Sequence, residues 1–208
     1  MFSENESDLI MPYLTKGAKV LEYGSGNSSL EIANIVKSLL TIEHEATWYN
    51  IVKRALPSNA NIIFKPPTCL TWGTDGTYEQ FKEYIESPYQ YKYFDVIIID
   101  GRARVGCAKY CKNVANKNTV IFVHDYQRPE YKEIEKHLQL IEVVETMAKF
   151  NKHLWLIYTA IYLKQKSTDN KKKLFAFNNG YALLEIPYYI NNPIKTIKQK
   201  ITELTIKN

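Results

Sequence analysis

The chain has 208 residues, which is long enough to bury a hydrophobic core within one domain. Its hydrophobic content of 45% and charged content of 24% are those of a globular protein. The net charge of +5 lies largely in the last third, where we interpret residues 171–173 as a solvated loop rather than a nucleic-acid-binding patch.

The sequence contains neither a membrane-spanning pattern nor a secretion signal. No apolar run approaches the roughly 20 residues that span a bilayer, so we expect no membrane partner. Residues 1–6 are acidic and lack the basic-then-apolar order of a signal peptide, which predicts a cytoplasmic protein. Cys69, Cys107 and Cys111 do not suggest a disulfide framework. Cys107 and Cys111 lack further metal ligands, and we interpret them as reduced, part-buried thiols.

The first half of the chain alternates between helical and extended patterns. Ser3 and Glu6 form a capping box at the start of the first helix, and Pro12 ends or kinks that helix. The loop at 65–76 is long and carries Trp72, so we interpret it as functional rather than as a mere connection. The predicted helices are 3–14, 30–40, 46–56 and 78–87, and the predicted strands are one ending at Leu21, 40–43 and 61–64.

The second half contains two strands that end in acidic residues. Residues 93–100 form an unbroken apolar run, which is typical of a central parallel strand covered on both faces. Residues 140–147 and 154–163 predict two further strands, and the short connection at 148–152 predicts an antiparallel hairpin. The other predicted elements are a helix at 105–116, a strand at 119–125, a helix at 129–137, a polar loop at 164–173, an apolar segment at 174–190 and a helix after Pro193.

This alternation predicts an α/β fold of the Rossmann-like, doubly wound type. We expect a seven-stranded, mostly parallel sheet with an antiparallel C-terminal hairpin and helices on both faces. One domain is expected over residues 1–208, with its core at about 15–163 and a C-terminal extension at 164–208.

A glycine-rich turn follows the first predicted strand. Gly24 and Gly26 allow a tight turn and let a ligand lie against bare main chain. Ser28 or Ser29 is placed to cap the helix that follows. Free N–H groups at such a helix start favour an anionic or polar ligand group, although Rossmann dinucleotide sites use similar turns.

Two acidic residues narrow the choice between these ligand classes. Glu22 precedes the glycines, and Glu43 ends the second predicted strand, where an acid is placed to bind two ribose hydroxyls. This Glu-x-Gly-x-Gly pattern with a following acid resembles the class I S-adenosylmethionine-dependent methyltransferases, although Ser28 stands where their third glycine is usual. The resemblance implies S-adenosyl-L-methionine as cofactor, bound by Glu22, Tyr23, Gly24, Ser25, Gly26, Asn27, Ser28, Ser29, Glu43, His44, Asp100 and Gly101.

A second group of polar residues follows two later strands. Because these strands are neighbours in such a sheet, Asp100 should face His124 and Asp125 across a small cleft. The three side chains suit a divalent metal, a general base for a hydroxyl nucleophile, or a structural role as helix caps. Among the candidate bases we prefer His124, since an unperturbed imidazole titrates near pH 6.5.

The sequences around these residues sharpen the resemblance. Residues 94–104 and 120–131 resemble small sugar O-methyltransferases: viral enzymes that methylate capsid-glycan sugars such as rhamnose, plant glucuronoxylan O-methyltransferases and metal-dependent macrolide-sugar O-methyltransferases. The resemblance covers about residues 3–160. The macrolide-sugar enzymes carry two acids where this chain has His124 and Asp125, and catechol-type relatives carry a lysine base at the position of Ala103.

The resemblance implies transfer of a methyl group to a sugar hydroxyl of a glycan. It implies His124, Asp100 and Asp125 as catalytic residues and Mg²⁺ or Mn²⁺ held by Asp100 and Asp125. The residues expected to bind the substrate are Arg102, Arg104, Trp72, Tyr126 and Arg128. If the source is viral, the location is the host cytoplasm.

Other functions stay open at the level of sequence. RNA 2′-O-methylation is one, but no lysine ends a strand to complete its catalytic set, and we expect no nucleic-acid partner. Methylation of another small molecule is a second, and a cofactor-binding module without activity is a third. The partner we expect is a sugar or glycan, and a homodimer is an open alternative to a monomer.

Overall fold

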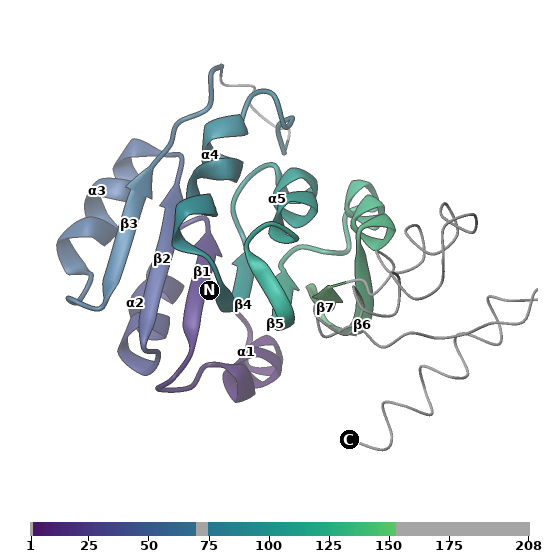
Figure 1. Ribbon diagram of the computed structural model, residues 1–208, viewed down its shortest axis with the longest axis horizontal. Helices are drawn as coiled ribbons and strands as arrows, with labels where there is room; N and C mark the ends of the chain where they lie inside the picture. Colours follow the sequence, from purple (N-terminus) through teal and green to yellow (C-terminus); the bar gives the residue numbers. More distant parts are fainter. Residues whose placement is uncertain (1, 70–74, 153–208) are drawn as a thin grey trace, which may run out of the picture. The chain divides into compact units, whose positions relative to one another are not determined.

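A computed structural model describes residues 2–69 and 75–152, which form a mixed sheet with helices around it (Figure 1). Seven strands follow the order β3-β2-β1-β4-β5-β7-β6. They are β1 (Lys19–Tyr23), β2 (Ser38–Glu43), β3 (Ala60–Phe64), β4 (Phe94–Ile99), β5 (Ala115–Val123), β6 (Leu138–Val144) and β7 (Met147–Lys152). The strands from β3 to β5 are parallel, whereas β7 is antiparallel to both β5 and β6. The predicted doubly wound, Rossmann-like fold is confirmed.

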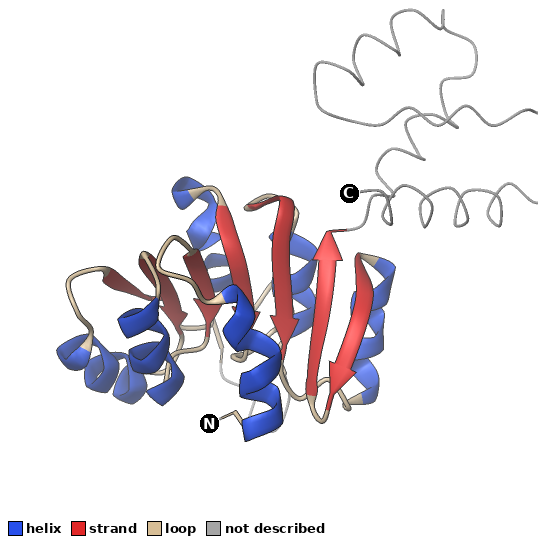
Figure 2. Cartoon of the chain, turned by 90° about the horizontal axis from the view of Figure 1, so that it is seen from below, coloured by secondary structure: helices blue, strands red, loops and turns tan. Residues whose placement is uncertain are grey.

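Helices lie on both sides of this sheet (Figure 2). The α-helices are α1 (Glu4–Ile10), α2 (Asn27–Ile35), α3 (Ala46–Ala55), α4 (Lys82–Glu86) and α5 (Arg104–Cys111), and the 3₁₀ helices are η1 (Met11–Tyr13), η2 (Ser87–Tyr91) and η3 (Pro129–Lys136). None of the helices described is long and apolar enough to cross a membrane. The predicted capping box is present, since Ser3 and Glu6 bond each other's backbone N–H at the start of α1.

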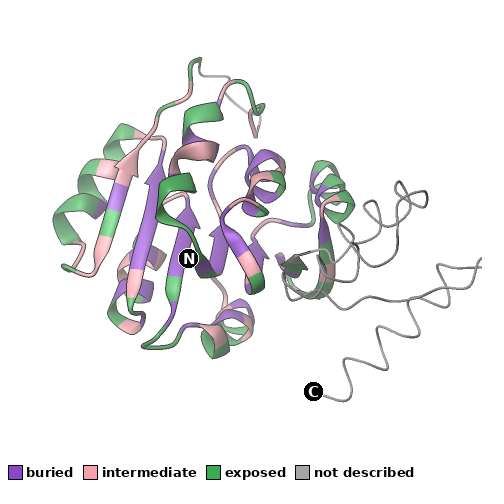
Figure 3. Ribbon diagram, in the orientation of Figure 1, coloured by how far each residue is buried: buried purple, intermediate pink, exposed green. Residues whose placement is uncertain are grey.

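The core is divided between the two faces of the sheet. Along β4, Val96 and Ile98 pack under α1 and α2, while Ile97 and Ile99 pack under α4 and α5. The central strands are therefore buried on both faces (Figure 3), which explains the unbroken apolar run in the sequence. Cys107 and Cys111 are fully buried in the second of these layers as free thiols.

Several predicted helices differ from the structure in their bounds or type; that predicted at 78–87, for example, is α4 at Lys82–Glu86. The helix predicted at 30–40 starts earlier and ends at Ile35, because the chain turns at Val36 and enters β2 at Ser38. The helix predicted at 105–116 ends at Cys111, because Ala115 already pairs with Phe94 of β4. The helix predicted at 129–137 is a 3₁₀ helix at Pro129–Lys136 rather than an α-helix.

An antiparallel hairpin is present as predicted, but its second strand, β7, covers the residues predicted as the connection. Residues 148–152, predicted as the connection, belong to β7, which pairs with both β5 and β6. Ala148 and Phe150 are buried while Lys149 and Asn151 are not, so this is an alternating strand rather than a polar loop. The turn lies at Glu145, which adopts a positive φ of 52°.

Several expectations fall outside the described residues. These are Trp72, the strand at 154–163, the polar loop at 164–173, the apolar segment at 174–190 and the helix after Pro193. All described residues belong to one compact unit, and a single domain over the full chain stays a prediction.

Candidate active site at the carboxyl ends of the strands

The glycine turn joins β1 to α2 and lies against the end of β4. Gly24 has a φ of +92°, and its N–H donates to the carbonyl of Ile42 at 2.9 Å. A Cβ on Gly24 would lie 2.6 Å from the Cα of Gly101, so a side chain would clash with that backbone. A Cβ on Gly26 would meet nothing within 4 Å. The turn therefore packs closely on one side and is open at Gly26.

Glu43 ties the glycine turn to the end of β2. One carboxylate oxygen accepts hydrogen bonds from the N–H and the hydroxyl of Ser25, both at 2.7 Å. The other accepts from the N–H groups of His44 and Glu45, both at 2.8 Å. Burial alone would raise the pKa of Glu43, but the hydrogen bonds from His44, Ser25 and Glu45 outweigh it and lower the pKa. The carboxyl is therefore ionised, and with 2% of the residue exposed its two oxygens already accept four hydrogen bonds from the protein.

Glu22 lies behind the same turn and is fully buried. Ser28 donates a hydrogen bond to it at 2.9 Å, and the hydroxyl of Ser29 donates a second. Burial is the main reason that the pKa of Glu22 is raised to about 7, against the lowering effect of these serines. Glu22 supports the turn from inside rather than facing a ligand.

The capping role expected of Ser28 or Ser29 differs in the structure. The N-cap of α2 is Gly26, whose N–H donates to the hydroxyl of Ser29 at 3.0 Å. Both serine hydroxyls instead donate hydrogen bonds to the buried carboxyl of Glu22.

The other expected cofactor residues fall into two groups. Asn27 is exposed at the start of α2, and the His44 ring packs edge-on against Phe81 and Tyr84. The Tyr23 side chain is in the core, where its hydroxyl donates to the carbonyl of Ile85 at 2.7 Å. Only the main chain of Tyr23 is therefore placed to serve the turn.

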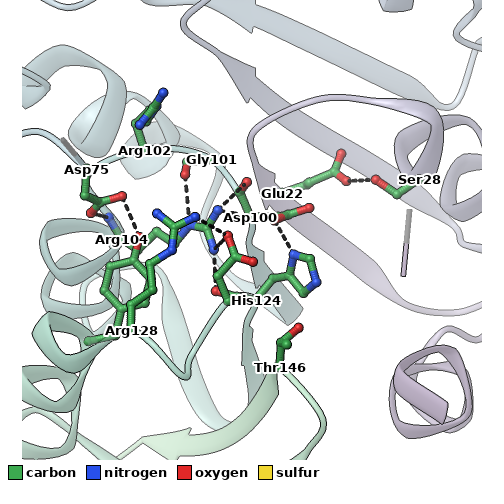
Figure 4. Close-up of polar contacts among 12 residues, drawn as sticks. Glu22, Ser28, Asp75, Asp100, Gly101, Arg102, Arg104, His124, Arg128 and Thr146 are labelled. Atoms are coloured by element: carbon green, nitrogen blue, oxygen red, sulfur yellow. Dashed lines mark hydrogen bonds and ion pairs between the residues drawn. The ribbon is translucent and has the colours of Figure 1, made fainter. Parts of the chain in front are cut away.

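The second half of the site is at the ends of β4 and β5. As their predicted pairing requires, the N–H of His124 donates to the carbonyl of Ile99 at 3.1 Å. The imidazole Nδ1 of His124 lies 2.7 Å from a carboxylate oxygen of Asp100. These two side chains form a close pair at the sheet edge (Figure 4).

A third side chain closes on His124 from α1. The imidazole Nε2 of His124 lies 3.5 Å from a carboxylate oxygen of Glu6. The ring of Phe2 meets the imidazole at 5.4 Å between centroids. Glu6 also accepts a hydrogen bond from the N–H of Thr146 at 3.1 Å. The hydrogen bond that the imidazole donates to Asp100 is the main reason that the pKa of His124 is raised, despite its partial burial, and Asp125 and Glu6 add to the effect.

Arg104, the first residue of α5, lies between the two acidic residues. One guanidinium nitrogen lies 3.0 Å from Asp125 and another lies 3.5 Å from Asp100. The side chain is buried, with 6% of the residue exposed. Arg128 contacts Asp125 from the rim of the site at 2.9 Å.

These contacts test the expected metal site. A divalent cation would need the carboxylate oxygens of Asp100 and Asp125, and the Arg104 guanidinium already lies against one oxygen of each. Among residues 2–69 and 75–152, no group of three or more histidine, cysteine, aspartate or glutamate side chains is placed to hold a metal. The residues present do not fit the metal that the resemblance implied.

Three residues expected to bind the substrate, Tyr126, Arg128 and Arg102, lie in different surroundings. Tyr126 is buried with its hydroxyl bonded to Glu135, so it packs in the core and is not placed to stack on a sugar. Arg128 is at the rim, where 43% of its side chain is exposed. The Arg102 side chain points away from the Arg104 cluster in Figure 4.

Sequence reasoning did not assign two residues of this cluster. Glu6 was recognised as a helix cap, and its second role toward His124 depends on how α1 packs. Asp75 accepts from the N–H of Arg104 at 2.8 Å and from the Tyr131 hydroxyl at 2.8 Å. Its only sequence signal was its place beside a glycine in a loop.

No protein-family model and no curated protein sequence matches the chain. Solved structures match its fold. A methyltransferase-like protein from Silicibacter pomeroyi is 21% identical with a TM-score of 0.63, covering 74% of this chain and 87% of that one. A TehB-like SAM-dependent methyltransferase from Corynebacterium glutamicum is 14% identical with a TM-score of 0.50, covering 72% and 88%. A precorrin 8w decarboxylase from the Methanobacterium thermoautotrophicum genome is 13% identical with a TM-score of 0.51, covering 74% and 92%.

These similarities to solved structures show the fold of the chain. The chain has the Rossmann-like fold of class I methyltransferases, as the sequence pattern of Glu22, Gly24, Gly26 and Glu43 indicated. At such identities the reaction and its substrates are matters for proposal.

Proposed function

We propose that the chain is an S-adenosylmethionine-dependent O-methyltransferase that acts on a sugar hydroxyl of a glycan. The observation that carries the proposal is the shared edge of the sheet. An open glycine turn beside an ionised Glu43 lies at the same strand ends as the Asp100–His124 pair. The fold of class I methyltransferases supports the reaction class, and the sequence resemblance around Asp100 and His124 supports the sugar acceptor.

The glycine turn and Glu43 suit the cofactor. Glu43 is an ionised acceptor that would bond ribose hydroxyls in exchange for its bonds from Ser25, and the open backbone at Gly26 would accommodate the methionyl part. When bound, S-adenosylmethionine supplies an electrophilic methyl group on a sulfonium. Glu22 holds this turn in shape through Ser28 and Ser29.

The acceptor hydroxyl needs a group that takes its proton. His124 is poorly suited, because its raised pKa favours the imidazolium form and both ring nitrogens face carboxylates. Asp100 is the better base, since it directly follows β4 beside Gly101 and 26% of its side chain is exposed. His124 then holds Asp100 in place and balances its charge, which reverses the role that the sequence favoured.

Methyl transfer from isotope-labelled S-adenosylmethionine tests the proposal. Purified protein is offered free sugars including rhamnose, oligosaccharides and RNA in parallel, and products are read by mass spectrometry. We expect a mass gain of one methyl group on a sugar and none on RNA. Methylated RNA would support the 2′-O-methyltransferase alternative.

Calorimetry with S-adenosylhomocysteine separates an enzyme from a cofactor-binding module. Binding with no turnover on any acceptor would contradict the enzymatic proposal. Absence of binding would contradict the cofactor assignment itself. Glu31→Gln, on the exposed face of α2, is the control variant for these binding measurements.

A further inference from the structure

The Arg104 side chain contacts main chain at the ends of two strands. Its Nε donates to the carbonyl of Gly101 at 2.9 Å, and one terminal nitrogen donates to the carbonyl of Asp100 at 3.2 Å. The other terminal nitrogen donates to the carbonyl of His124. The guanidinium therefore binds main chain from both β4 and β5, and Figure 4 shows it at the centre of these contacts.

The same guanidinium neutralises two carboxylates. It lies 3.0 Å from Asp125 and 3.5 Å from Asp100. Asp125 has a positive φ of 56°, which is uncommon for a residue other than glycine, and its ion pairs with Arg104 and Arg128 hold it in that conformation. Without a cation between them, two acidic side chains would face each other at one sheet edge.

Arg104 is itself fixed from the other side. Its N–H donates to Asp75, and its guanidinium carbon lies 5.5 Å from the centre of the Tyr131 ring. The Tyr131 hydroxyl donates to the same Asp75 carboxylate. A buried guanidinium with this many planar contacts is held in one position, which a flexible lysine ammonium would not reproduce.

We propose that Arg104 is a built-in cation that takes the place of a divalent metal between Asp100 and Asp125. It positions Asp100 for the reaction, and methyl transfer requires no metal. This inference rests on the proposed function for its activity measurements only. Arg104 is a positioning residue, because it acts through Asp100 and the two strand ends rather than on the substrate.

The wild-type protein gives the first test. We expect no Mn²⁺ bound at millimolar metal by electron paramagnetic resonance, and unchanged kcat after treatment with EDTA. One tightly bound Mn²⁺ that disappears in Asp125→Asn, or loss of kcat in EDTA with recovery in Mg²⁺, would overturn the proposal.

Removing the guanidinium gives the second test. In Arg104→Ala the two carboxylates lose the cation that they share, although His124 and Arg128 remain, and we expect the variant to gain one Mn²⁺ site that the wild type lacks. We expect kcat to fall at least tenfold with little change in cofactor affinity, and added guanidinium to restore part of it. Lys109→Ala is the matched control, because Lys109 lies on the same helix and is exposed. A folded Arg104→Ala that gains no Mn²⁺ site would contradict the inference.

Arg104→Lys keeps the positive charge and is the variant to measure if Arg104→Ala does not fold. It should bind no Mn²⁺ and should lower kcat while leaving KM nearly unchanged, because one ammonium cannot bond both strand ends at once. Wild-type kcat in Arg104→Lys would overturn the positioning role. If no sugar is methylated by the wild type, the proposed function fails, while Mn²⁺ binding still decides the inference about Arg104.

Discussion

The two halves of the site hold their carboxylates in different ways. In the glycine turn, Glu22 and Glu43 are bound mainly by neutral donors, namely serine hydroxyls and backbone N–H groups. At the ends of β4 and β5, Asp100 and Asp125 are bound by a histidine and two arginines. Neutral donors leave the first half suited to polar hydroxyls, whereas charged partners suit the second half to a step in which a proton moves.

This difference shows that the position of an acid at a strand end does not define its role. Glu43 and Asp100 both follow parallel strands of one sheet. Their partners come from different elements, the turn after β1 for Glu43 and the first residue of α5 for Asp100. The four predictions that follow remove members of each half in turn.

The largest effect is expected from Asp100→Asn. The amide cannot take a proton, so kcat should fall about 10²- to 10⁴-fold while calorimetric affinity for S-adenosylhomocysteine changes little. Asp95→Asn on the same strand is the control, since Asp95 is exposed at the opposite end. A variant that keeps its turnover would return the role of base to His124.

Glu43→Gln should act on binding rather than on turnover. The neutral amide loses charge-assisted hydrogen bonds to ribose hydroxyls and to the turn, and affinity should fall about 10- to 100-fold, or roughly 1.5–3 kcal/mol. Calorimetry with S-adenosylhomocysteine measures this. Parent-like affinity would show that ribose does not bind at the end of β2.

Glu22→Gln should change the pH dependence of stability. The pKa of about 7 in the folded protein lies above the ordinary 4.5, so the folded state binds more protons between those values. The free energy of unfolding should therefore fall as pH rises from about 4.5 to about 7, by at most ~1.4 kcal/mol per pH unit. The glutamine variant should lose this decrease in urea unfolding series. An unchanged slope would contradict the burial effect.

The raised pKa of His124 affects stability in a higher pH range than the raised pKa of Glu22. Its charged form stabilises the fold fully below the ordinary value of 6.5, and that stability is lost as pH rises through the raised pKa. Measurements between pH 5 and 6 therefore report on Glu22 with little contribution from His124.

The smallest effect is expected from Arg128→Ala. Arg128 pairs with Asp125 at the rim, and its side chain is 43% exposed, so its loss should cost less than ~1 kcal/mol in unfolding free energy. Arg104 keeps its own contact with Asp125 at 3.0 Å. A larger loss in thermal or urea unfolding would mean that the rim pair, rather than Arg104, holds this acid.

The sequence allowed much of the site to be predicted because its residues follow strands. Gly24 and Gly26 lie in a turn between a strand and a helix, and Asp100 and His124 end neighbouring parallel strands. The hydrophobic period is a local property, and the strands of such a fold pair in a known order, so the approach of Asp100 to His124 followed from the order of the elements.

The role of Arg104 did not follow from such patterns. The sequence placed Arg102 and Arg104 together beside the site, and their difference depends on how the chain enters α5. Ala103 has a positive φ of 51°, and α5 begins at the next residue, whose guanidinium binds both strand ends. Backbone conformation of this kind at an alanine has no sequence signal.

Burial explains the other differences. Tyr126 follows a strand end as an aromatic ligand residue would, yet it packs against Phe150 of β7. That contact depends on where β7 lies, and β7 was misplaced because its polar residues alternate with its apolar ones.

The contact of Phe2 and Glu6 with His124 couples two parts of the chain. The Phe2 ring meets the imidazole edge-on, and Glu6 of the same segment binds the turn between β6 and β7. A change at Phe2 or Glu6 would therefore alter the surroundings of His124 as well as the packing of α1. Variants of this segment should be compared by their turnover as well as by their stability.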